Sequence, residues 1–96
     1  MEYKLFRGKK LLGIVIHEID DFPSHKGIFK PADDFWPVAR LFEREINLLK
    51  SGEMVEWRII RDELIAPGLE LRASEGKSRT IINPIIHIDG SEVWWS

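Results

Sequence analysis

The sequence predicts a single α+β domain, in which a mainly antiparallel sheet packs against one long and one shorter helix. Three observations predict this fold class. Residues 33–50 repeat apolar side chains with the period of an amphipathic helix. The segments before and after it alternate apolar and polar residues and are separated by tight-turn residues, as hairpin strands are. The chain has 96 residues, enough for one core, so we expect residues 1–96 to form one domain.

The N-terminal segment is expected to form a β-hairpin. Residues 3–7 and 11–19 have strand patterns, and residues 8–10, GKK, supply the turn between them. Residues 11–16 are apolar on both faces of the expected strand. The second strand is therefore expected to lie centrally in the sheet, covered on both sides for part of its length.

A loop is expected to follow this hairpin. Residues 20–27, with the sequence DDFPSHKG, contain Pro23 and Gly27, which commonly interrupt regular structure. Residues 28–30 are then expected to form a short extended piece that leads into the long helix.

The long helix is expected to span residues 33–50. Asp33 or Asp34 can cap its first turn, because a short carboxylate accepts hydrogen bonds from free backbone N–H groups. Pro37 falls within the first turn, where its missing N–H removes no helical hydrogen bond. Gly52 then supplies the stop signal.

Two residues break the apolar pattern of this helix. Glu45 falls within the apolar face. It is expected either to bend to the rim and pair with an Arg or Lys, or to be a buried acid that serves chemistry. Trp36 falls on the polar face, where it either covers a loop or contacts a partner, since Trp is enriched at binding hot spots.

The C-terminal half is expected to contain a second helix and an antiparallel meander. Residues 54–65 have a mixed pattern, and their length and the Pro67-Gly68 terminator favour a helix. Asp89-Gly90 is a hairpin signal between the last two strands. The expected strands are residues 69–73, 79–82, 85–89 and 92–95, with a turn at residues 75–78.

Composition excludes several classes of protein. The chain has no cysteine, which excludes a disulfide scaffold and a cysteine-based zinc site and fits a reducing cytoplasm. Its net charge is -2 with both signs interspersed, so we expect no nucleic-acid partner. No apolar run approaches the length of a membrane span, and the N-terminal residues lack a signal-peptide pattern. A Gly-rich phosphate-binding loop is also absent, and we expect no cofactor and no membrane association.

The densest polar segment lies between the first hairpin and the long helix. His17, Asp21 and His25 combine imidazole and carboxylate groups, which suit zinc, iron or manganese, so a loose metal or small-molecule site is a candidate here. Ser24, His25 and Asp20 are the residue types of a nucleophilic triad, but adjacent Ser and His side chains do not readily face each other from one loop. The sequence alone therefore assigns no catalytic residue and no metal ligand.

His87 is the third histidine of interest. It lies two residues before Asp89 on an expected strand, so the two side chains share a face. One interpretation is a half-buried His87 oriented by Asp89 at the end of the sheet. The other brings His87 across to His17 and forms a polar pocket with Glu45 or Asp21.

The chain contains four tryptophans, two of which are adjacent near its end. Trp94 and Trp95 point to opposite faces of the last strand. One of them is expected in the core, and the other is expected to be exposed or covered by a helix, a loop or a second subunit. An exposed aromatic residue beside an edge strand indicates an interface, and Trp95 is taken as a candidate contact residue.

Several short motifs are spread over most of the chain. They are Tyr3-x-Leu5-Phe6, Leu11-Leu12-Gly13, Asp21-Phe22-Pro23-x-x-x-Gly27-x-Phe29-x-Pro31, His87-Ile88-Asp89-Gly90 and Trp94-Trp95. Together they resemble a family of small bacterial proteins of uncharacterised activity. The resemblance implies a bacterial, cytoplasmic, single-domain protein and transfers no activity and no site residue.

We expect a small cytoplasmic module that acts without catalysis by binding another protein or itself, with Trp36 and Trp95 as contact residues. The alternative is a protein or enzyme that binds a small molecule or a metal near residues 17–26. Its candidate residues are His17, Asp21, His25 and His87, to which Glu45 is added as a further candidate. The sequence does not decide whether the protein is an enzyme.

Overall fold

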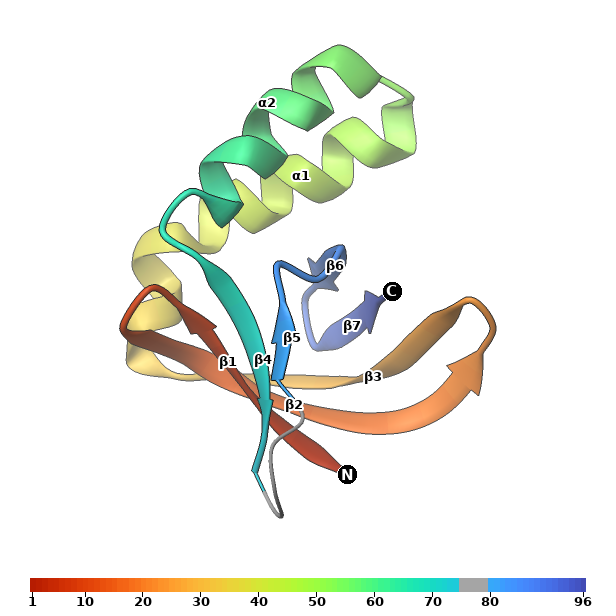
Figure 1. Ribbon diagram of the computed structural model, residues 1–96. Helices are drawn as coiled ribbons and strands as arrows, with labels where there is room; N and C mark the ends of the chain where they lie inside the picture. The colour runs from red at the N-terminus through yellow and green to blue at the C-terminus, as the bar shows by residue number, and fades with distance from the viewer. Residues whose placement is uncertain (75–79) are drawn as a thin grey trace.

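The part of the chain that the structure describes forms a seven-stranded antiparallel sheet that curls strongly, with two α-helices across its open side (Figure 1). This computed structural model describes residues 1–74 and 80–96, and it confirms the predicted α+β class. The elements are β1 (Glu2–Arg7), β2 (Lys10–Asp21), β3 (Ser24–Pro31), the 3-10 helix η1 (Asp33–Val38), α1 (Ala39–Ser51), α2 (Met54–Ile65), β4 (Leu69–Ala73), β5 (Thr80–Ile82), β6 (Ile86–Asp89) and β7 (Glu92–Trp95).

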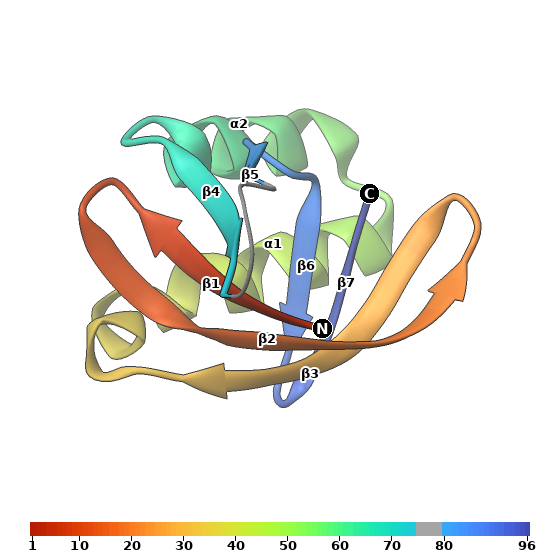
Figure 2. The same cartoon turned by 60° about the horizontal axis from the view of Figure 1, so that its bottom comes forward.

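The strand order is β5-β4-β1-β2-β3-β7-β6, with antiparallel neighbours throughout. The predicted N-terminal hairpin is therefore confirmed as β1–β2. The C-terminal strands form two separate pairs, β4–β5 and β6–β7, at opposite edges of the sheet, rather than one continuous meander. The physical reason is that β1 lies beside β4 and β3 lies beside β7, so β5 and β6 are not neighbours. Figure 2 shows the curl that results from this order.

Residues 83–85 connect the two edges. The Asn83 backbone N–H donates to the carbonyl of Leu69 at 2.6 Å, and Asn83 Oδ1 accepts from the Leu69 N–H at 2.9 Å. Asn83 has a φ of 47°, in the left-handed region that Asn tolerates better than most residues. Pro84 then cannot continue a ladder because it has no N–H. The turn expected at residues 75–78 lies outside the described residues.

The prediction of a loop at residues 20–27 was wrong. β2 continues to Asp21 and β3 begins at Ser24, so most of this segment is a long hairpin that extends beyond the core (Figure 1). Gly27 pairs with His17 in the ladder, and a Cβ at Gly27 would lie 2.0 Å from the carbonyl oxygen of Ile16. Gly27 therefore permits a close backbone approach within a strand and does not mark a loop.

The long helix is divided. Residues 33–38 form a 3-10 helix, and the α-helix begins at Ala39, after the Pro37 ring. The N-cap is Ala32 and has no side-chain hydrogen bond, so the prediction that Asp33 or Asp34 caps the helix was wrong. Gly52 ends α1 with a φ of 76°, as predicted. The predicted second helix matches α2 at both ends.

The core lies between the concave face of the sheet and the helix pair. Its buried side chains come from β1, β2, β3, β4, β6, β7, η1, α1 and α2, and the partly buried Ile81 of β5 packs against it. Its buried members are Tyr3, Leu5, Leu12, Val15, Phe29, Phe35, Phe42, Ile60, Leu64, Leu69, Leu71, Ile86, Ile88, Val93 and Trp95. Within the described part of the chain, neither α1 nor α2 has the length and apolar character that crossing a membrane requires.

Replacement of Gly27 by alanine tests the close approach in the hairpin. The new Cβ would collide with backbone at Ile16, so the strands must shift, and we expect a loss of about 1–3 kcal/mol in the free energy of unfolding. Urea denaturation followed by circular dichroism measures this. The neighbouring exposed change Lys26→Ala is the control, with an expected loss below about 1 kcal/mol. Equal stabilities for the two variants would contradict the role of Gly27 in the close approach of the two strands.

Candidate functional site

A β-bulge in β2 gathers three polar side chains on one face of the hairpin. The ladder pairs His17 with Gly27, shifts register across the next residue, and then pairs Asp20 with His25. In a regular strand, residues 17 and 20 would point to opposite faces. The extra residue in the bulge turns Asp20 onto the face that His17 occupies. We call His17, Asp20 and His25 the hairpin site.

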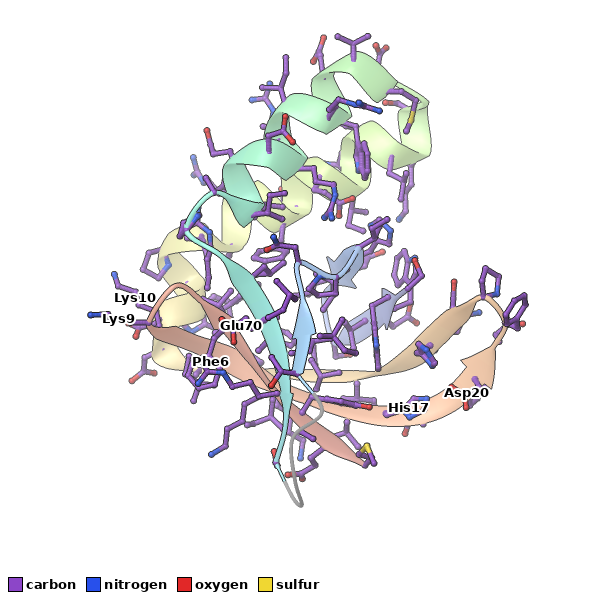
Figure 3. The ribbon with its side chains drawn as sticks, viewed as in Figure 1. Phe6, Lys9, Lys10, His17, Asp20 and Glu70 are labelled. Carbon is purple, nitrogen blue, oxygen red and sulfur yellow. The ribbon has the colours of Figure 1, made fainter. Side chains whose placement is uncertain are left out.

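The two imidazoles of the hairpin site meet at one carboxylate oxygen. His17 Nε2 lies 2.8 Å from Asp20 Oδ1, and His25 Nδ1 lies 2.5 Å from the same atom. An ionised carboxylate only accepts hydrogen bonds, so both ring nitrogens donate to it. Figure 3 shows His17 and Asp20 on the part of the hairpin that extends away from the helices.

The Trp95 ring packs against both histidine rings of the hairpin site. The His17 and His25 rings each lie 5.5 Å from the Trp95 ring, measured between centroids. Trp95 is only 2% exposed and belongs to the core. The prediction of Trp95 as a surface contact residue was therefore wrong, because β7 pairs with β3 and its Trp95 face is the inner face of the curled sheet.

The environment of Asp20 favours its charged form. The hydrogen bond from His25 is the largest influence and lowers the pKa of the Asp20 carboxyl below its usual value, while partial desolvation raises it. The hydrogen bond from His17 and the electrostatic attraction of both imidazoles lower the pKa further. The site therefore holds a carboxylate rather than a carboxylic acid near neutral pH.

Asp21, which was predicted to join His17 and His25, lies elsewhere. Its side chain pairs with Lys26 at 3.2 Å. Successive residues of a strand point to opposite faces, so the bulge that brings Asp20 into the site turns Asp21 away. The sequence contained both carboxylates, but it gave no signal for the bulge that selects between them.

A second polar cluster is buried where α1, α2 and β6 meet. Glu45 is 2% exposed, and its Oε2 accepts from the indole N–H of Trp57 at 2.6 Å and shares a hydrogen bond with His87 Nδ1 at 2.7 Å. Its Oε1 is buried and has no partner among the described residues. Glu45, Trp57 and His87 are called the Glu45 network. The prediction that Glu45 bends to the rim and pairs with Arg or Lys was wrong.

The Glu45 network and the hairpin site are separate. His87 packs against Trp94 at a centroid distance of 5.3 Å, whereas the hairpin site packs against Trp95 on the other face of β7. The predicted convergence of His87 with Glu45 is present, but His17 is not part of it. Asp89 does not orient His87, since its carboxylate pairs with Lys50 at 3.0 Å.

The third candidate is an apolar groove of about 410 Å³ between η1, α1 and the β6–β7 hairpin. Phe29, Phe35 and Phe42 are buried and form its floor. The rim includes Trp36, which is 63% exposed, and the Lys50–Asp89 ion pair. We call this groove the Trp36 groove and define it by the residues Phe29, Phe35, Trp36, Phe42, Lys50 and Asp89.

Trp94 lies at another hollow on the outer face of the hairpin. Ile19 and Ile28 are exposed beside it, and Trp94 itself is half-buried. The two adjacent tryptophans were predicted to divide between core and surface. Trp95 is the core residue, and Trp94 is the partly exposed one.

No family model, curated protein or solved structure matches the chain. The functional proposals below therefore depend on the geometry of the chain itself.

Replacement of Glu45 by alanine tests the buried network. It leaves the buried His87 without its hydrogen bond, and an unsatisfied buried polar group costs about 1–3 kcal/mol. We expect a loss of that size in the free energy of unfolding, measured by urea denaturation. Glu43→Ala is the matched control on an exposed position of the same helix and is expected to change stability by less than about 0.5 kcal/mol. Equal losses in both variants would refute a structural role for the network.

Replacement of His25 by glutamine tests the electrostatics of Asp20. Because the His25 hydrogen bond is the largest cause of the lowered pKa, its weakening should raise the Asp20 pKa toward its usual value. Carbon-13 NMR titration of the side-chain carboxyl measures this. Since the folded pKa is the lower one, the Asp20 contribution to stability is present at neutral pH and disappears as the pH falls through the folded pKa. An unchanged Asp20 pKa in the variant would contradict this cause.

Proposed function

We propose that the protein is a non-enzymatic module that associates with a protein partner through the Trp36 groove. The observation that carries this proposal is the exposure of Trp36, at 63%, beside a floor of buried aromatic rings. Apolar surface in contact with water costs roughly 25 cal/mol per Å², and association that covers the indole recovers this free energy. Trp is also one of the residues most enriched at binding hot spots.

The composition of the groove supports recognition of a protein segment. Protein interfaces combine an apolar centre with a polar rim. In this groove three phenylalanines form the apolar part, and the Lys50–Asp89 ion pair contributes to the polar rim. A volume of about 410 Å³ lies in the range of binding pockets, which is about 300–1,000 Å³. One or two apolar side chains of a partner fill such a volume, while the exposed charges of the rim bond to its backbone.

The ring of Trp36 is held in place by its neighbour. Its centroid lies 5.6 Å from that of Phe35, whose ring contacts both Phe29 and Phe42. This aromatic row reduces the side-chain freedom that Trp36 would lose on binding, so less of the binding free energy is spent on ordering. Support for a bacterial cytoplasmic setting comes from the resemblance of the sequence motifs, and we include that setting in the proposal.

Substitution of Trp36 by alanine is expected to weaken association by at least about 30-fold, since hot-spot residues contribute about 2 kcal/mol or more. Affinity capture from the native cell lysate, read by quantitative mass spectrometry, identifies a partner, and sedimentation of the purified chain over a concentration series measures self-association. The affinity of each complex found is then measured with the wild type and the variant.

Ile59→Ala is the matched control because Ile59 is 62% exposed and lies on α2, away from the groove. A complex that is lost with Trp36→Ala and kept with Ile59→Ala supports the proposal, and thermal melting verifies that both variants stay folded. If no complex, either with a partner or between copies, depends on Trp36, the proposal is wrong.

A further inference from the structure

We propose that His17, Asp20 and His25 bind a divalent transition-metal ion at the end of the β2–β3 hairpin. Two imidazoles and one carboxylate form a donor set that suits zinc and the neighbouring first-row metals. One ligand atom from each side chain lies within 4.8 Å of the other two. This site goes beyond the proposed function and does not depend on it. η1, which carries Trp36, and the hairpin end lie on opposite sides of the molecule in both views (Figures 1 and 2).

The distances in the hairpin site require only a small adjustment. Zinc ligands at about 2.0–2.2 Å in a tetrahedron place their donor atoms about 3.3–3.6 Å apart. The two histidine–aspartate distances are 2.8 and 2.5 Å, so each of these pairs must open by about 1 Å to meet that geometry. The ligand nitrogens of the two rings, which lie within 4.8 Å of each other, must also come to about 3.3–3.6 Å. The Asp20 side chain is 67% exposed and is free to open the two histidine–aspartate pairs by rotation about its own bonds.

The fold holds the two rings close to each other. His17 and His25 lie on adjacent strands and pack on the buried Trp95 ring. Gly27 lies opposite His17, and its missing Cβ permits the close strand approach at the bulge that places Asp20 on their face. Ligand side chains that are carried by strands and packed against a buried ring lose little conformational entropy when they bind a metal, and this favours affinity.

Metal binding would replace the two histidine–aspartate hydrogen bonds of the hairpin site by bonds from the ring nitrogens to the metal. In the metal-free protein, His17 Nε2 and His25 Nδ1 carry the hydrogens that point at Asp20. A neutral imidazole that binds a metal through one nitrogen keeps its hydrogen on the other nitrogen. On metal binding, the hydrogen on the bonding nitrogen of each ring passes to the other ring nitrogen or to solvent, and the bonding nitrogen presents a lone pair. Three protein ligands leave at least one coordination position for water.

Titration of the untagged 96-residue chain with Zn²⁺ in an isothermal calorimeter tests the proposal, and Co²⁺ provides a visible absorption spectrum of the same site. We expect one ion per chain and a melting temperature that rises with metal concentration. Asp20→Asn and His25→Gln should each weaken binding by at least about tenfold, since even loss of a group that only orients a ligand costs about 10–100-fold.

Asp21→Asn is the matched control, because it removes the same charge from the adjacent residue on the opposite face. We expect this variant to bind Zn²⁺ with the affinity of the wild type and to give the same Co²⁺ spectrum. Absence of binding at millimolar Zn²⁺ would overturn the proposal. Equal weakening by Asp20→Asn and Asp21→Asn would also overturn it, since binding would then follow net charge, and so would full binding by both Asp20→Asn and His25→Gln.

Discussion

The covalent link between the two edges of the sheet is the constraint on which the rest of the structure depends. In a flat seven-stranded sheet the edge strands would lie about 29 Å apart, which is six spacings of about 4.8 Å. The chain from Ile82 at the end of β5 to Ile86 at the start of β6 spans at most about 14 Å. The sheet must therefore curl until its edges approach each other, and a concave face with a closed core results.

The curl of the sheet also determines where the two helices pack. Because the edges approach without forming a ladder, one side of the sheet stays open, and the helix pair covers it with core residues such as Phe42 and Ile60. The contact between α1 and β6 places the carboxylate of Glu45 at His87, and α2 adds the indole of Trp57. A buried acid generally adds little net stability compared with a well-packed apolar side chain. Here its hydrogen bonds to Trp57 and His87 link α1 to α2 and to β6.

The sequence was a good guide to local structure and a poor guide to strand pairing. The helix at residues 54–65 and the stop at Gly52 follow from nearest neighbours along the chain, and both were predicted. Strand order follows from contacts between distant segments, so the separation of β5 from β6 had no local signal. The loop predicted at residues 20–27 is part of a hairpin, because Gly27, a residue type that commonly breaks strands, here permits a close approach of the backbone across the ladder.

The candidate sites show the same division. The presence of polar groups at His17 and His25 was visible in the sequence, but the choice of Asp20 over Asp21 depends on a bulge of one residue. The division of the two adjacent tryptophans between two faces followed from strand alternation. Which of them is buried depends on the sheet neighbour of β7, and the sequence does not identify that neighbour. Trp36 was identified by its position on the polar side of a periodic segment, and the structure places it at a groove.

The four tryptophans give the protein a built-in set of optical probes. Trp36 lies in water beside the groove, Trp57 donates to Glu45, Trp94 packs on His87, and Trp95 lies beneath the hairpin site. Indole emission shifts to longer wavelength with exposure to water, so we expect Trp36 to emit at a longer wavelength than the buried Trp95. Variants that keep one indole at a time would allow each region of the molecule to be followed separately by fluorescence, without an attached dye.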